Sequence, residues 1–132
     1  LQVVKNTTSD LKPEINKVIT GEEIAYFQQL IRRIPVTDNV LQYAVQLAVK
    51  TRPNTPAATK DVNSYVSWGA GPRASQFLVI GAKCHAALNG KFSPDMEDVR
   101  AVALPILRHR IVRNYRAEAD GVTVEKIIQG LF

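Results

Sequence analysis

Residues 67–90 read SWGAGPRASQFLVIGAKCHAALNG, and this stretch decides the fold. Apolar side chains recur between residues 74 and 88 at intervals of three and four, which is the spacing of one helix face. Pro72 suits the first position of a helix because it lacks a backbone N–H and has a fixed φ. Asn89-Gly90 is a typical helix end. The stretch therefore predicts a long helix that begins near Pro72, after a Gly-Ala-Gly loop.

Two further helices are predicted before this stretch. Residues 20–23 form a capping box, in which a hydroxyl residue is followed three residues later by glutamate, and the apolar spacing after it predicts a helix over roughly 21–34. A second helix, over about 38–50, has a broad apolar face. Residues 51–64 contain two prolines and no apolar period, which predicts a loop. Residues 1–20 are polar and turn-forming, so we expect a linker or lead-in segment there.

The chain after this stretch is also expected to be helical. Ser93-Pro94-Asp95 has the cap, proline and acid that open helices. Pro105 should break or kink that helix near Leu104, because it removes a backbone donor and clashes with the preceding turn. A short last helix is expected after Thr123. The sequence thus predicts an all-α fold, a small bundle of four to six helices, with residues 21–132 as its domain.

Composition limits the class of protein. The 132 residues are 45% hydrophobic and 22% charged, which is ordinary for a globular domain, and their net charge is +5. No apolar run approaches the ~20 residues of a membrane span. The single cysteine, Cys84, excludes an internal disulfide and suits a cytoplasmic location. The positive charge favours anionic partners such as nucleotide phosphate, nucleic acid or an acidic protein. Because the chain starts at Leu1 rather than Met, we expect it to be a piece of a larger protein.

Arg73 is the candidate functional residue. It lies at the start of the long predicted helix, where the positive end of the helix dipole disfavours a cation. A phosphate bound there would meet free N–H groups, the dipole and a guanidinium fork. We therefore expect Arg73 to be exposed and to contact phosphate, with Gly69, Gly71 and Pro72 shaping its approach. The alternative interpretation is a surface arginine that follows an ordinary loop.

Other motifs are weak or absent. The chain contains no phosphate loop, no H-E-x-x-H and no C-x-x-C, and no metal site is expected. Cys84 and His85 are adjacent in a helix and point about 100° apart, which argues against a nucleophile–base pair. The arginine-rich residues 108–116 leave open a nucleic-acid-binding surface, although only Tyr115 interleaves them for base stacking. A structural domain that meets an acidic partner is a third interpretation.

The sequence WGAGPRASQFLVIGAKCHAALNGK (68–91) followed by SPDMEDVRAVALPILRHRI (93–111) resembles the C-terminal lid of MoxR-family AAA+ ATPases. In that family a Gly-Ala-Ser-Pro-Arg-Ala segment opens the lid helix. The resemblance implies that Arg73 is a catalytic sensor-2 residue and that Gly71, Pro72 and Arg73 contact ATP. The ATP and its Mg²⁺ would be bound mainly by a core domain. Gly71 departs from the family, which usually has Ser there, so a hydroxyl contact at this position is not expected.

The resemblance also implies a setting for the lid. The Walker A, Walker B and sensor-1 elements would lie in a core domain before Leu1, so this chain is not expected to hydrolyse ATP by itself. The intact protein would be an ATP-driven, chaperone-like maturation factor in the cytoplasm. Its expected partners are the upstream core, further copies in a homo-oligomeric ring and a von Willebrand A-domain protein. Nucleic acid and membranes are not expected partners.

Overall fold

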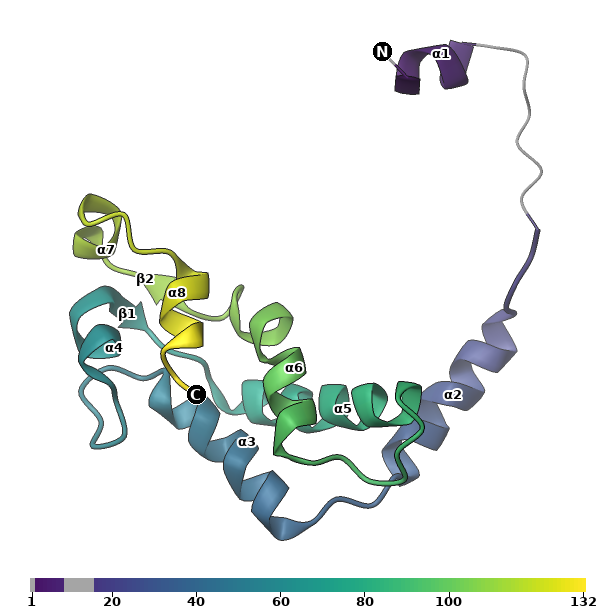
Figure 1. Ribbon diagram of the computed structural model, residues 1–132, viewed down its shortest axis with the longest axis horizontal. Coiled ribbons are helices and arrows are strands. Elements are labelled where there is room, and N and C mark those ends of the chain that lie inside the picture. The colour runs from purple at the N-terminus through teal and green to yellow at the C-terminus, as the bar shows by residue number, and fades with distance from the viewer. Residues whose placement is uncertain (1, 9–15) are drawn as a thin grey trace.

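Helices make up most of the structure, a computed structural model that describes residues 2–8 and 16–132. This confirms the predicted all-α class (Figure 1). The elements in chain order are α1 (Gln2–Thr8), α2 (Gly21–Arg33), α3 (Asp38–Lys50), α4 (Lys60–Tyr65), β1 (Val66–Trp68), α5 (Pro72–Leu88), α6 (Met96–Leu107), β2 (Val112–Arg113), α7 (Tyr115–Ala119) and α8 (Val124–Gln129). Among the described residues, the one sheet is the antiparallel pair β1–β2, in which Val66 lies opposite Arg113 and Trp68 opposite Val112.

The central pair of helices, α5 and α6, runs antiparallel. His85 near the end of α5 contacts Asp98 near the start of α6, whereas Phe77 near the start of α5 contacts Arg110 just after α6. Helix α3 packs against both, α2 lies against α5, and α4, α7, α8 and the sheet gather at the opposite end from α2 (Figure 1). The end of α6 therefore lies beside the start of α5.

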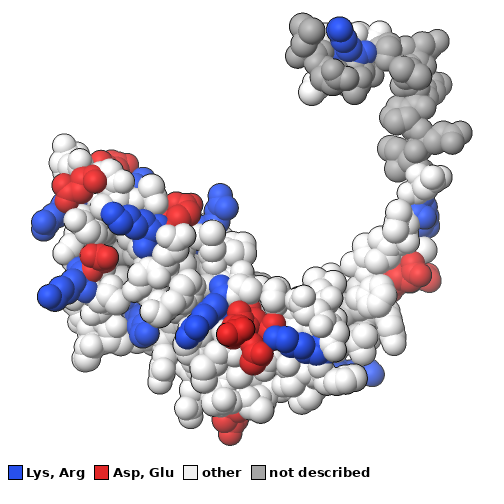
Figure 2. Space-filling model, in the orientation of Figure 1, with Lys and Arg blue, Asp and Glu red and all other residues white. Residues whose placement is uncertain are grey.

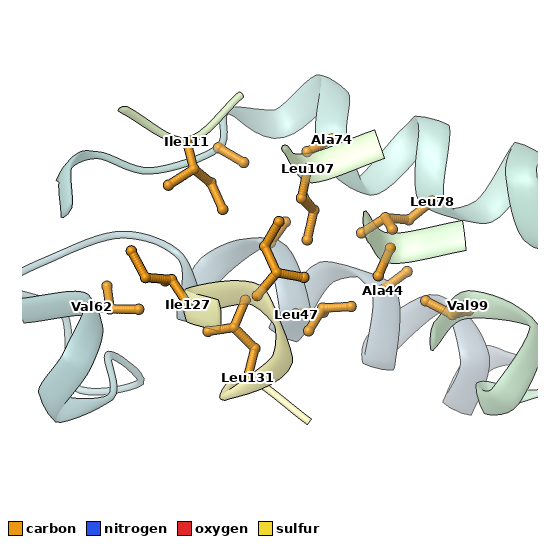
Figure 3. Close-up of a cluster of buried hydrophobic side chains, with 14 of the residues drawn as sticks. Ala44, Leu47, Val62, Ala74, Leu78, Val99, Leu107, Ile111, Ile127 and Leu131 are labelled. Carbon is orange, nitrogen blue, oxygen red and sulfur yellow. The ribbon is translucent and has the colours of Figure 1, made fainter. Parts of the chain in front are cut away.

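The core lies where α3, α5, α6 and α8 meet. Leu47, Leu78, Leu107 and Leu131 point toward one another from different parts of the chain, and each is almost fully buried (Figure 3). Several buried positions on α3, α5 and α6 are alanines, which let the helix backbones approach closely. Helix α2 differs, because none of its residues is buried.

The predicted helix starts are largely confirmed, because caps are local signals. The Thr20 hydroxyl accepts a hydrogen bond from the backbone N–H of Glu23, and the Glu23 carboxylate accepts one from the N–H of Thr20. Helices α2, α3 and α5 begin where the sequence predicted. The Thr123 hydroxyl accepts from the N–H of Lys126 and caps α8, also as predicted.

Three details of the prediction were wrong. The loop expected over residues 51–64 contains the start of α4, because the Thr59 hydroxyl caps a short helix whose Val62 is fully buried. Helix α6 is capped by Asp95, whose carboxylate accepts from two backbone N–H groups, so Ser93 and Pro94 lie outside the helix. Pro105 does not end α6 near Leu104. The helix continues to Leu107, and the N–H of Arg108 donates to the carbonyl of Leu104 at 3.1 Å.

The segment before α2 is only partly described. Residues 2–8 form the short helix α1, which the sequence did not predict, and residues 9–15 of the expected linker lie outside the described residues. Within residues 2–8 and 16–132, none of the helices has the length and apolarity that crossing a membrane requires.

Candidate functional site

The loop before α5 is fixed by contacts with the end of α3. The buried hydroxyl of Thr51 accepts a hydrogen bond from the N–H of Ala70 at 2.8 Å, and Arg52 Nε donates to the carbonyl of Ala70 at 2.9 Å. Gly69 is pressed against the same backbone, since an added Cβ would lie 2.3 Å from the carbonyl oxygen of Thr51. The Gly-Ala-Gly loop is therefore fixed against the end of α3 at Gly69 and Ala70. Gly69 makes room for close packing on Thr51 and Arg52.

The start of α5 carries no negative side chain and no side-chain cap. Gly71 is the N-cap residue with φ −78° and ψ −179°, Pro72 occupies the first helical turn, and that turn contains no acidic residue. The space around Gly71 is open, with no atom within 4 Å of an added Cβ. The positive end of the helix dipole therefore faces solvent without local compensation.

Arg73 is exposed, as expected. It lies beside the inward face of α5, on which Ala74 and Leu78 are fully buried. Within the described part of the chain, its guanidinium has no hydrogen bond or ion pair. Gly71, Pro72 and Arg73 thus stand together at an open helix end, and the arginine is directed out of the bundle rather than into it.

A hollow of about 430 Å³ lies next to this helix end. It is lined by residues 52–54 on one side and residues 67–72 on the other. Arg52 and Trp68 line this hollow, and neither was predicted as a site residue. Trp68 is 75% exposed. No periodicity or motif links residue 52 to the Gly-Ala-Gly loop. Only the hydrogen bonds through Thr51 and Ala70 bring them together.

Two larger hollows, of about 540 and 640 Å³, lie along α5 on the side of α2 and α3. Their walls are mostly apolar and include Phe27, Ile80 and Val45, with Arg32 shared between them. In Figure 2, charged groups are interspersed over the visible face, with red side chains at the start of α2 and a mixed red and blue cluster over the start of α6. These walls lack the converging polar groups that a phosphate needs, and the hollow beside Gly71 is the better candidate.

The arginines of residues 108–116 mostly serve the fold. Arg110 lies over the ring of Phe77, Arg113 donates to a backbone carbonyl at 2.7 Å, and Arg116 pairs with a carboxylate one turn further along. They therefore do not form a continuous row of free guanidinium groups. This arrangement favours a packing role over the nucleic-acid-binding interpretation.

His85 pairs with a carboxylate of α6 rather than with Cys84. Its Nδ1 lies 2.7 Å from Oδ1 of the buried Asp98, and Lys91 Nζ lies 2.9 Å from Asp95 and 3.1 Å from Asp98. The Lys91 ammonium lowers the pKa of Asp95 to about 2. Burial raises the pKa of Asp98, but hydrogen bonds from the Asp95 backbone, His85 and Lys91 outweigh it and leave this pKa below its ordinary value. The cluster joins the end of α5 to the start of α6.

Comparison with known proteins defines the class. Residues 58–131 match the AAA lid domain family, and the chain belongs to it. Chaperone MoxR1 of Mycobacterium tuberculosis is 29% identical over 116 residues, which cover 88% of this chain and 31% of that protein. YeaC of Bacillus subtilis, an uncharacterized protein, is 24% identical over 115 residues, covering 87% of this chain and 33% of YeaC.

A solved structure agrees with these relatives. The crystal structure of a protein described as a candidate ATPase from Cytophaga hutchinsonii superposes with a TM-score of 0.84 at 26% identity, over 98% of this chain and 39% of that one. The chain is thus an AAA lid domain, in agreement with the resemblance found in its sequence, and it is similar to part of a MoxR chaperone and of a protein described as a candidate ATPase. It spans about a third of the length of the curated relatives it matches.

Proposed function

We propose that this lid closes over ATP bound to a core domain outside the chain, and that Arg73 contacts the phosphates. The observation that supports this most directly is the unpaired guanidinium of Arg73 at the uncapped, positive end of α5. Placing a cation there costs free energy in the lid alone. A phosphate between the helix end and the guanidinium would remove that cost and use both groups.

The proposed role of Arg73 follows from how phosphoryl transfer moves charge. Negative charge shifts toward the leaving oxygen as the γ-phosphoryl group departs, and a guanidinium in contact with the phosphates would stabilise it. Gly71 and Pro72 add no acidic group, so the phosphates can approach the helix end closely. Mg²⁺ and most ATP contacts would belong to the core domain.

The fixed loop before α5 would couple the position of the lid to the bound nucleotide. Because Thr51 and Arg52 hold Ala70 against α3, the backbone at the start of α5 cannot shift toward a phosphate separately from the bundle. A contact between Arg73 and the nucleotide would instead rotate the whole bundle. Hydrolysis and phosphate release would then be coupled to the angle between lid and core.

The whole-protein setting is proposed from the relatives. One relative is named as a chaperone and the structural neighbour is described as a candidate ATPase. We infer that residues 21–132 act as the lid and residues 1–20 as a linker to the core. The intact protein would be a cytoplasmic, chaperone-like maturation factor that assembles as a homo-oligomeric ring and acts with a von Willebrand A-domain partner.

Replacing Arg73 in the full-length protein tests this function. Arg73→Ala should lower ATP turnover by roughly 10- to 100-fold, the loss expected for one or two charge-assisted hydrogen bonds. The melting temperature should stay unchanged, because the side chain is exposed. Arg100→Ala is the matched control, since Arg100 is also exposed but donates to the hydroxyl of Tyr43 at 2.8 Å. Wild-type turnover in the Arg73 variant would contradict the proposal.

A further inference from the structure

Arg110 and Arg73 are linked through Phe77, although the two arginines are far apart in the sequence. Phe77 follows Arg73 by four residues in α5, which places both side chains on the same helix face, one turn apart. The guanidinium carbon of Arg110 lies 5.0 Å from the centroid of the Phe77 ring. A second guanidinium therefore lies against the side chain that is one helical turn after Arg73.

The Arg110 side chain is held in place by one of its guanidinium nitrogens, and its other N–H groups stay available. Its Nη1 donates to the backbone carbonyl of Ile106 at 2.6 Å and also contacts Nε2 of His109. The guanidinium carbon lies over the Phe77 ring. In the part of the chain that the structure describes, Nε and Nη2 have no partner. These two groups can bind an oxyanion together, and the side chain loses little freedom because it is already fixed.

Among residues 2–8 and 16–132, no carboxylate forms an ion pair with Arg73 or Arg110. The ion pairs among the described residues are made elsewhere, by His85 and Lys91 with Asp95 and Asp98 and by Arg116 with Asp120. Neither the first turn of α5 nor the last turn of α6 contains an acidic residue. Arg73 and Arg110 thus form an uncompensated pair of cations beside a positive helix end.

We propose that Arg110 is a second phosphate-binding residue of the lid, and that Arg73 and Arg110 together favour nucleoside triphosphate over diphosphate. The inference rests on the proposed function of Arg73. Two guanidinium groups at the same end of α5 match an anion whose charge is spread over several phosphates. The γ-phosphate, which the diphosphate lacks, would then carry much of the lid's contribution to binding.

Nucleotide binding to the full-length protein tests this inference. The dissociation constants of ADP and of a slowly hydrolysed ATP analogue would be measured by calorimetry for wild type, Arg73→Gln, Arg110→Gln and Arg100→Gln. Arg110→Gln should weaken the triphosphate about tenfold or more, as expected for a charge-assisted bidentate contact, and ADP less than threefold. Arg100→Gln should bind both nucleotides like the wild type.

A conservative variant separates binding from folding. Arg110→Lys keeps the charge and can still reach the carbonyl of Ile106, but it loses the fork, so it should fold normally and weaken the triphosphate by an intermediate factor. If Arg110→Gln lowers the melting temperature and weakens both nucleotides equally, or if Arg110→Lys binds the triphosphate as wild type does, Arg110 supports only the fold and the inference is overturned.

The remaining outcomes distinguish this inference from the proposed function. Loss of triphosphate affinity in Arg73→Gln together with wild-type affinity in Arg110→Gln would overturn the inference and leave the function of Arg73 intact. Wild-type affinity in both variants would overturn both. A change in oligomer size without a change in nucleotide affinity in Arg110→Gln would instead assign Arg110 to a contact between subunits and overturn the inference.

Discussion

Gly69→Ala should be among the most damaging single-methyl changes in this lid. The added Cβ would lie 2.3 Å from the carbonyl oxygen of Thr51 and 2.6 Å from the Cα of Arg52. Both atoms belong to the backbone, so no flexible side chain can move aside. The loop before α5 must shift away from the end of α3 instead.

The expected cost can be worked out from the contacts that such a shift breaks. The hydrogen bonds of Ala70 with Thr51 and with Arg52 have lengths of 2.8 and 2.9 Å and would both be strained or lost, at about 1 kcal/mol each. Overpacking adds roughly 1–3 kcal/mol. The total is about 3–5 kcal/mol, which corresponds to a fall of roughly 10–20 °C in melting temperature for a chain of this size.

Thermal and urea unfolding of this chain, followed by circular dichroism, would measure the effect. Gly71→Ser is the matched control, because nothing lies within 4 Å of an added Cβ there and a serine can cap α5. We expect it to change stability by less than about 0.5 kcal/mol, in the stabilising direction. If Gly69→Ala is as stable as the wild type, the loop is not fixed against Thr51 and the account of how Arg73 is positioned fails.

Two further predictions concern the carboxylates that join α5 to α6. Asp98→Ala should cost about 2–3 kcal/mol in urea unfolding, because it leaves Lys91 and His85 without their buried acceptor and opens the capping box of α6; a loss below about 0.5 kcal/mol would contradict this. Since Asp95 and Asp98 have lowered pKa values in the folded chain, their contribution should be present above the ordinary pKa of about 4 and be lost as the pH falls below it, in the case of Asp95 through its pKa of about 2. Asp95→Asn should flatten that part of the pH profile of the urea midpoint, and an unchanged profile would exclude Asp95 as a source.

The long helices could be predicted because their signals are local. The capping box at Thr20, the proline at residue 72 and the apolar spacing after each are readable without knowing the fold. Helix α4 has six residues and one buried apolar side chain, Val62, so it produces no period. In the β1–β2 pair, Val66 lies opposite Arg113, which is 47 positions later in the chain. No local sequence pattern encodes such a pairing.

Some residues of the candidate site could likewise be predicted from local sequence, and others could not. Arg73 could be selected from its neighbours alone, since a helix start, a proline and a glycine loop are adjacent in the sequence. Arg52 and Arg110 could not, because Thr51 and Phe77 bring them to the site only through packing. The sequence also suggested the wrong reason for Gly69. A glycine before a helix can allow ligand approach or tight packing, and only the position of the Thr51 backbone distinguishes the two.

The alanine-rich interface of α5 makes the central helix pair mechanically stiff. Its fully buried residues are Ala74, Leu78, Ala82 and Ala86, and three of these four have no side-chain torsion that could absorb a displacement. A helix of 17 residues is about 25 Å long. A displacement of α5 at Arg73 would therefore also move its other end, near Lys91 and Asp98, because the helix would rotate as a rigid body. Few side chains in its interface could rearrange to absorb the motion.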